Sequence, residues 1–450
     1  MNTPGPGMNL PQTRRWNWLS RQSWFTRQSW WWWALVGLLS LGQLQRLQIT
    51  ADIAVNIHDG LLAGWAIWLA YRQRRFLVDK VAAQASRYSW QGVVVMSWVG
   101  LGWATALSQG ELSALAVLFT VRLGLYLSWA TLLWWTKPVS LSRLELGLVG
   151  LVGLTAWFGW LQYVLIPDTR VLAVLGWDNH LYRLIGTQFD PNFTGILLVL
   201  GWLYVSARWP AAHLPLAWRR LLLLALTGAI ALTFSRASYL AFGIVLGMSF
   251  VYGLISGRGR STKRAIITAI LFVLMVVLAP KPGGEGVKLD RTSSVTARAT
   301  ATRRFVAGLK PHHWLIGRGL FNFGSDQASQ SSDGQRSDGG QQFGSGQRSN
   351  AGQRSENSPR PDHAVFPDSL PVTLLVSLGL PGAATVSWTI VKQIWEWWPI
   401  RPVTAGSWTA VLIHSLFNNT LLQSFVLIVL LLITISEQAR FEQHSSADLE

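Results

Sequence analysis

The chain contains no cysteine, and charged residues are scarce in it. Without cysteine, neither a disulfide framework nor thiolate chemistry is possible anywhere in its 450 residues. Only 13% of the residues are charged, half are hydrophobic, and the mean hydropathy is +0.28. Soluble domains carry about 25% charged residues, so this composition excludes an ordinary soluble protein and indicates a membrane protein.

Acidic residues are particularly few, with 21 Asp and Glu against 38 Lys and Arg, and the net charge is +17. The basic residues are spread over segments that flank apolar runs, and they are not gathered on one helix or motif. Nucleic-acid-binding domains concentrate their basic residues on one face. We therefore expect no nucleic-acid partner.

Motifs for nucleotides, serine nucleophiles and metals are also missing. The sequence has neither a Walker motif nor a GxSxG elbow, which mark nucleotide and hydrolase sites. His312 and His313 are adjacent, which is not the spacing of two metal ligands on one helix face. We expect neither a metal nor a cofactor.

Long apolar runs and 27 tryptophans are what the chain has in excess. Runs of roughly 17 to 25 apolar residues are typical of transmembrane helices. Trp clusters at 30–33 and 395–398 are typical of the aromatic belt at a membrane interface. The sequence predicts an all-α integral membrane protein with about twelve transmembrane helices. The predicted spans are 30–45, 52–71, 91–108, 112–135, 144–166, 192–207, 219–234, 237–255, 264–280, 369–391, 404–419 and 421–436.

The distribution of Lys and Arg orients these spans. Residues 1–29 lack an early apolar core and a cleavage site, so we expect a cytoplasmic tail rather than a signal peptide. The cytoplasmic connections 72–87, 208–220 and 258–264 then hold five, three and four basic residues, as the positive-inside rule requires. Both termini are expected in the cytoplasm, and the protein in the cytoplasmic (inner) membrane.

The same orientation places one long segment outside, as a large external (periplasmic) loop before the third-last helix. Within this loop, residues 324–361 repeat GQRS and are rich in Gly, Ser and Gln, so they are expected to form a disordered spacer. The predicted organisation is an N-terminal tail (1–29), nine helices (30–280), the loop (281–368), three helices (369–436) and a cytoplasmic tail (437–450).

Polar residues lie at the start of the predicted span 192–207. Burying polar groups near hydrocarbon costs free energy unless they have partners or a function. The polar residues are Arg183, Asp190 and Asn192, and Gly186 and Pro191 stand among them. Asp-Pro-Asn is a helix-start signature. One interpretation is therefore a helix cap beside an arginine that extends to the interface, and the other is a site at the membrane boundary.

Two arginine-containing segments fall on the same external side. Ser235 and Arg236 form a tight turn between two apolar runs, where an arginine marks either a site or an interfacial side chain. Arg298 and Arg303 belong to TARATATRRF in the long loop. Their guanidinium groups suit bidentate phosphate binding, although arginine clusters are also ordinary surface features.

The end of the long loop, just before the predicted span 369–391, contains two candidate bases. His363 and Asp368 precede this span, and either could accept a proton from a hydroxyl. The alternatives are a solvated histidine and a capping aspartate. His414 and Asn418 lie near the last spans and are interpreted as polar groups of helix packing. Because the polar clusters share one face, we expect one site at the external membrane boundary.

The order of these motifs resembles the O-antigen ligase and O-antigen polymerase superfamily. The resemblance rests on R…G…DPN before a span, TFSRAS at a span boundary, a large external loop with arginines and a GxG-like turn, and SLGLPG, over about 183–382. It implies an all-helical polytopic fold with a periplasmic active site. The donor is then a glycan on undecaprenyl diphosphate, and the acceptor a hydroxyl of lipid A-core or of another glycan. Neither metal nor nucleotide is implied.

The resemblance also implies roles for particular residues. Arg183 and Arg236 are expected to hold the donor diphosphate, with Arg298 or Arg303 as a third contact. Membrane lipids surround the site. The residues expected to shape it are Gly186, Asp190, Pro191, Asn192 and Ser235.

One departure from the family pattern leaves the base open. The family carries His-Asn about ten residues before the Gly that ends the amphipathic run. Counting back from Gly379, that slot holds Asp368, and His363 lies further upstream. The alternatives to a transferase are a transporter and a structural subunit. Some relatives of this superfamily have been labelled as inorganic-carbon transporters. A transporter places ionisable residues near mid-membrane, whereas the notable charges here cluster at one boundary. Arg122 is the one clear exception inside a predicted span.

Overall fold

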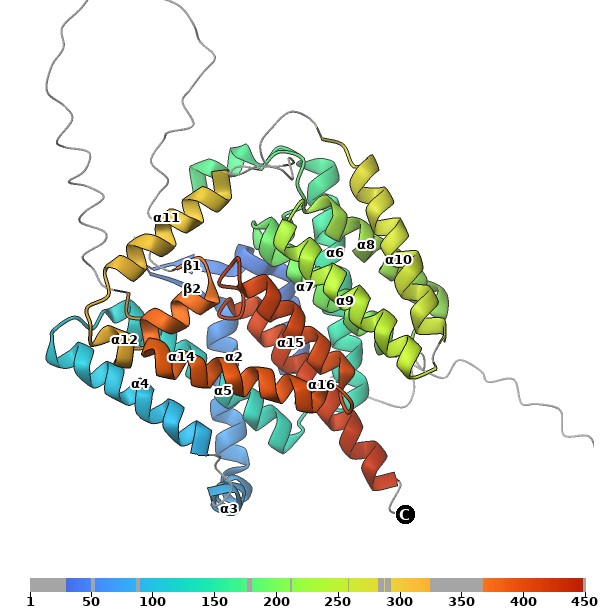
Figure 1. The fold of residues 1–450 in the computed structure, drawn as a ribbon. Helices are drawn as coiled ribbons and strands as arrows, with labels where there is room; N and C mark the ends of the chain where they lie inside the picture. The colour runs from blue at the N-terminus through green and yellow to red at the C-terminus, as the bar shows by residue number, and fades with distance from the viewer. Residues whose placement is uncertain are drawn as a thin grey trace, which may run out of the picture.

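A computed structural model shows an array of α-helices with one short hairpin (Figure 1). The structure describes residues 30–49, 53–85, 90–175, 180–210, 213–257, 259–281, 287, 293–323 and 367–447. In chain order the elements are α1 (Trp30–Leu41), η1 (Gly42–Gln45), β1 (Arg46–Gln48), β2 (Ala54–Asn56), α2 (Ile57–Arg72), α3 (Arg74–Ala85), α4 (Trp90–Ser108), α5 (Ala114–Thr136), α6 (Leu141–Leu165), η2 (Arg170–Leu175), η3 (Gly186–Gln188), α7 (Pro191–Ala207), α8 (Leu216–Leu232), α9 (Arg236–Ile255), α10 (Gly259–Leu278), α11 (Ser293–Ala307), α12 (His313–Ile316), α14 (Leu370–Trp397), α15 (Pro402–Ser415) and α16 (Ser424–Ala447).

Each predicted apolar stretch corresponds to a helix: α1, α2, α4 to α10, and α14 to α16. Within the described ranges, α5, α6, α9, α10, α14 and α16 are long and apolar enough to cross a membrane. An all-α membrane protein is therefore confirmed. Helices α11 and α12 form in the segment that the sequence analysis assigned to the external loop.

The second predicted span starts later than expected because a hairpin takes its first residues. β1 pairs antiparallel with β2, and Arg46 stands opposite Asn56. Asn56 and Asp59 then form a capping box, in which the Asn56 N–H donates to Asp59 Oδ2 at 3.2 Å. Because a capping box satisfies free N–H groups at a helix start, α2 begins at Ile57.

The last helix runs past its predicted end at 436, into residues assigned to a tail. Glu437 is 3% exposed and accepts hydrogen bonds from Arg208 Nε at 2.9 Å and from the Thr404 N–H at 3.0 Å. Arg440 Nε donates to Glu145 of α6 at 3.0 Å. Two ion pairs join α16 to α6 and to the end of α7, a hydrogen bond joins it to α15, and together they hold residues 437–447 in the helix.

Helix α7 lies in the interior of the array. It packs against α6, α8, α9, α15 and α16, and every residue from Thr194 to Ser206 is buried. A helix that is apolar on all sides is typical of a protein interior. The neighbours of α7 therefore fix the position of both its ends.

Tryptophans pack in the interior as well as at the surface. Trp32, Trp65 and Trp129 are fully buried, whereas Trp395 is 82% exposed. The indole N–H of Trp32 donates to Arg143 O at 3.1 Å. The aromatic-belt interpretation of residues 30–33 therefore does not hold for Trp32, which packs against α6.

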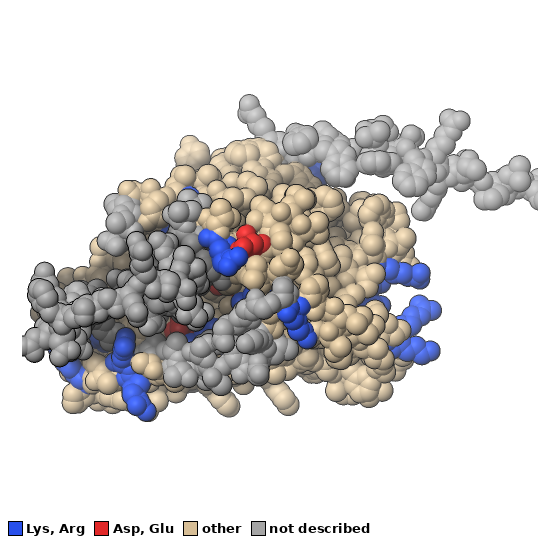
Figure 2. Space-filling view, turned by 90° about the horizontal axis from the view of Figure 1, so that it is seen from above, with Lys and Arg blue, Asp and Glu red and all other residues tan. Residues whose placement is uncertain are grey.

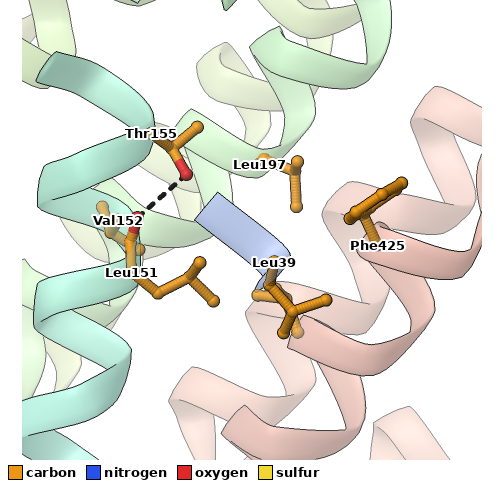
Figure 3. Close-up of a pocket in the computed structure, with 7 residues that line it drawn as sticks. Leu39, Leu151, Val152, Thr155, Leu197 and Phe425 are labelled. Atoms are coloured by element: carbon orange, nitrogen blue, oxygen red, sulfur yellow. Dashed lines mark hydrogen bonds between the residues drawn. The ribbon is translucent and has the colours of Figure 1, made fainter. Parts of the chain in front are cut away.

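A small gap in this core lies among α1, α6, α7 and α16 (Figure 3). Leu39, Leu197 and Phe425 face it, and the Thr155 hydroxyl donates to Leu151 O at 2.9 Å. Its free volume is about 10 Å³, whereas one water needs about 10–15 Å³. The gap is a packing defect and not a ligand site.

Helix α14 is broken at Gly379, and a loop segment docks at the break. Gly379 has φ 67° and ψ 179°, and Pro381 follows inside the helix. The Arg318 N–H donates to Val376 O at 2.8 Å, so the segment after α12 pairs with a carbonyl next to the break. The indole N–H of Trp98 donates to Leu315 O at 3.1 Å, which fixes the segment against α4 as well.

Replacing Gly379 with alanine is expected to destabilise the fold by about 1–3 kcal/mol, because this backbone region is almost restricted to glycine. The added Cβ would also meet Leu315 O at 2.5 Å. Gly124→Ala is the matched control: it lies in α5 with no heavy atom within 4 Å of the added Cβ. Thermal unfolding in detergent measures both, and equal midpoints for the two variants would contradict the docking described here.

Candidate functional site

The loop before α7 is shaped by Gly186 and Asp190. Gly186 has φ +52°, a conformation that favours glycine. Asp190 Oδ1 accepts hydrogen bonds from the N–H groups of Asn192 and Phe193 at 2.6 and 3.0 Å, and Pro191 occupies the first turn of α7. The helix-cap interpretation of Asp-Pro-Asn is confirmed.

Arg183 is 5% exposed despite its charge. Its Nε donates to Thr233 O at 2.9 Å and its Nη2 to Phe234 O at 3.3 Å. These carbonyls follow the last turn of α8, where unpaired C=O groups and the helix dipole favour a cation. Arg183 thus holds the turn between α8 and α9, and its role in donor binding stays a prediction.

Ser235 connects the start of α9 to the start of α7. Its Oγ accepts from the Ser238 N–H at 3.3 Å, as an N-cap. The same hydroxyl donates to Asn192 Oδ1 at 2.8 Å. Because one hydroxyl makes both the cap and the cross-link, the N-termini of α7 and α9 lie side by side.

A buried histidine extends this contact to α15. His414 is fully buried, with Nε2 3.1 Å from Ser238 Oγ and Nδ1 2.6 Å from Thr420 Oγ1. Ser238 Oγ also lies 2.9 Å from Ser235 Oγ. All three bonds form together when Thr420 donates to Nδ1, Nε2–H donates to Ser238, and Ser238 donates to Ser235. This chain agrees with the packing role expected of His414.

Arg298 of α11 reaches the same end of the helix array. Its Nη2 donates to Asn418 Oδ1 at 3.0 Å. Burial lowers the pKa of Arg298, while the nearby carboxylates of Asp368 and Asp190 act to raise it and Arg236 acts to lower it. Arg298 therefore lies within electrostatic range of Arg236, Asp190 and Asp368, and these four residues are called the cluster below.

The remaining predicted site residues fall in different places. Arg303 shares α11 with Arg298 but is exposed, and the spacing places it roughly 140° around the helix from Arg298. Asp368 is exposed and precedes Ser369, the N-cap of α14. His363 lies outside the described residues. The structure therefore brings Arg298, and not Arg303, to the cluster.

Three helices begin at this cluster. The bond between Ser235 and Asn192 joins the starts of α7 and α9, and α14 begins two residues after Asp368. Asp190 and Ser235 already accept hydrogen bonds from N–H groups at the starts of α7 and α9, so it is mainly the helix dipole that makes these N-termini attractive to anions. With Arg236 and Arg298 beside them, these N-termini form a setting suited to a diphosphate.

A cavity of about 230 Å³ lies among α5, the start of α7 and the turn after α15. Phe193 and Phe321 supply apolar walls, and Arg122 and Asn419 supply polar groups. Asn419 Oδ1 and the neighbouring Asn418 Nδ2 are buried without a hydrogen-bond partner among the described residues. Buried polar atoms without partners indicate a place for water or a ligand, and this volume exceeds the need of one water many times.

Arg122, on the wall of this cavity, is paired. Its Nη2 lies 3.0 Å from Asp59 Oδ2 of α2, and its Nε donates to Tyr126 Oη at 2.6 Å. The Tyr126 hydroxyl donates in turn to Asp59, and His58 Nε2 lies 3.5 Å from Asp59 Oδ1. Asp59 of α2 thus neutralises Arg122, the charged residue within the apolar sequence of α5.

The turn after α15 contributes residues that no sequence motif marks as functional. Asn418, Asn419 and Thr420 follow an apolar stretch as a run of three polar side chains, which is their only signal.

Comparison with protein families, with curated proteins and with solved structures gives no match to this chain.

Proposed function

We propose that this protein is a membrane glycosyltransferase of the O-antigen ligase kind. It transfers a glycan from undecaprenyl diphosphate to a hydroxyl of lipid A-core or of another surface glycan. In this proposal twelve helices cross the cytoplasmic membrane, both termini are cytoplasmic, and 281–368 forms the external loop. A polymerase of the same superfamily would use the same donor site with a growing glycan as the acceptor.

The convergence of Arg236 and Arg298 on three helix starts carries the proposal. The planar guanidinium fork matches phosphate oxygens, and the dipoles of the helix N-termini favour negative charge. When the bond between the sugar and the diphosphate breaks, negative charge grows on the leaving group. Fixed cations and helix dipoles stabilise that charge at no cost of reorganisation.

Asp368 is the candidate base among the described residues, because it is exposed and interacts with Arg298. Its carboxylate takes the proton of the acceptor hydroxyl while that oxygen attacks the anomeric carbon. Undecaprenyl diphosphate then leaves with the electron pair of the broken bond. His363 is the second candidate for this role. Arg183 positions the Ser235–Arg236 turn through its bonds to Thr233 O and Phe234 O.

Loss of the protein tests this function in cells. A strain that lacks it is expected to accumulate lipid-linked glycan and to lose the corresponding surface glycan, because the donor is made but not consumed. Extracted lipid-linked glycans and gels of surface polysaccharide measure the two pools, and a plasmid copy of the wild-type chain is the control. Unchanged pools in both fractions would overturn the proposal.

Two observations favour a transporter as the second candidate. Helix α14 is discontinuous at Gly379, and the Arg122–Asp59 pair joins two apolar helices. Broken helices and buried charges are common at transporter substrate sites. A transporter predicts uptake of bicarbonate or another small ion into vesicles that contain the purified protein, with lipid-linked glycan pools unaffected by its loss.

A further inference from the structure

The end of α7 opposite the candidate site is held by two arginines from other helices. Arg219 of α8 donates from Nη2 to Ser206 O and from Nε to Val205 O, the latter at 3.3 Å. Arg264 of α10 donates from Nη1 to the same Ser206 O. The last carbonyls of a helix lack partners within it, so both arginines cap α7.

The unusual feature is that two like charges meet at one carbonyl. Arg264 repels Arg219, and both side chains are half-buried. Glu437, which α16 brings to this end of α7, is already engaged by Arg208 and the Thr404 N–H. Two half-buried cations this close favour a shared anion.

The sequence supplies no acidic residue nearby in the chain. Between Asp190 and Glu285 there are nine Lys and Arg and no Asp or Glu. Arg220 and Lys263, next to the two capping arginines, are exposed. Figure 1 places the end of α9 and the start of α10 at one edge of the molecule. Figure 2 shows Lys and Arg gathered at this edge, without Asp or Glu among the described residues seen there. This edge is strongly positive.

The surroundings point to an anion that carries hydrocarbon chains. Helices α8 and α10 pack against each other, and both expose large apolar side chains beside the arginines. Trp218 and Leu221 of α8 are 58% and 56% exposed, and Ile267 of α10 is 57% exposed. Apolar side chains exposed along membrane helices are covered by lipid. An anion bound at Arg219 and Arg264 would lie directly beside that lipid.

We propose that Arg219 and Arg264 form a binding site for a phosphate group, supplied by the head group of an anionic phospholipid whose acyl chains cover α8 and α10. Each guanidinium carries five N–H groups. Among the described residues, the bonds to Val205 O and Ser206 O engage two of those of Arg219 and one of those of Arg264. Arg219 and Arg264 lie within the first two turns of α8 and α10, the end of a helix where the dipole favours an anion. The site is independent of the glycan-transfer function.

Lipid binding to the full-length protein tests the site. Wild-type protein is placed in nanodiscs of phosphatidylcholine, with and without phosphatidylglycerol, and bound lipid is counted by native mass spectrometry. An Arg219→Gln/Arg264→Gln variant is expected to bind phosphatidylglycerol roughly thirtyfold more weakly, from the loss of two cations at a lipid surface. The Arg220→Gln/Lys263→Gln variant removes the same charge at the same end, and its affinity for phosphatidylglycerol is expected to fall clearly less.

The thermal unfolding midpoint separates a lipid site from simple capping. If the arginines only cap α7, the first variant loses the same stability in both kinds of nanodisc, and this result overturns the proposal. Equal loss of lipid binding in both variants also overturns it, because diffuse surface charge would then explain the affinity. If inorganic phosphate raises the wild-type midpoint in pure phosphatidylcholine, the site takes soluble phosphate; if only phosphatidylglycerol does, it takes the lipid.

Discussion

Replacing Arg298 with alanine is expected to lower glycan transfer by about 100-fold to 1,000-fold, the usual cost of removing one group that stabilises developing negative charge. Arg298 is the cation that α11 brings to the start of α7, α9 and α14, and Asn418 Oδ1 holds its guanidinium at 3.0 Å. In the proposed reaction, Arg236 would then be the one arginine of the cluster left beside the leaving diphosphate. Surface glycan restored in a strain that lacks the chromosomal copy measures the effect.

Arg303→Ala is the matched control for this prediction. It removes the same side chain from the same helix, at an exposed position, and is expected to restore glycan close to the wild-type level at equal membrane expression. If Arg303→Ala abolishes transfer while Arg298→Ala retains it, the site lies on the other face of α11.

Replacing Glu437 with alanine is expected to destabilise the protein by about 3–5 kcal/mol, because removing one partner of a buried ion pair leaves the other unpaired. Glu437 is 3% exposed, and it accepts from Arg208 at the end of α7 and from the Thr404 N–H of α15. The folded fraction that survives heating in detergent, followed by size-exclusion chromatography, measures the loss.

The Glu442 ion pair provides the control for Glu437. The side chain of Glu442 is 33% exposed and that of its partner Lys137 is 59% exposed, and exposed pairs contribute only about 0–1 kcal/mol. Glu442→Gln is therefore expected to leave the unfolding midpoint nearly unchanged. Equal midpoints for Glu437→Ala and Glu442→Gln would show that the buried pair does not hold α16 to α7.

The helices and the cap of α7 could be predicted from the sequence, because apolar length and capping chemistry are local. Asp190 of the DPN segment caps α7, as interpreted, whereas Ser235, which was expected in a tight turn, also caps α9. The break at Gly379 was not predicted, since its cause is the approach of Leu315 and Gly317 from a distant segment. Likewise α16 extends beyond 436 because of ion pairs to α6 and to the end of α7 and a hydrogen bond to α15.

The choice between Arg298 and Arg303 could not be made from the sequence, because it depends on how α11 is rotated against the turn at Asn418. The ion pair of Arg122 could not be predicted from the sequence for a similar reason. Asp59 lies on a different helix, 63 residues away, and its short-range signal was that of a helix start. Long-range contacts of single polar side chains are not encoded in local periodicity.

Direct binding of undecaprenyl diphosphate to the purified protein tests the central claim, that Arg236, Arg298 and three helix starts form a diphosphate site. Wild type, Arg298→Ala and Arg303→Ala are compared in detergent by native mass spectrometry, with undecaprenol as the uncharged ligand. We expect wild type and Arg303→Ala to retain the diphosphate, Arg298→Ala to lose it, and undecaprenol to bind all three alike. Equal retention of the diphosphate by Arg298→Ala and wild type would show that Arg298 does not form a diphosphate site.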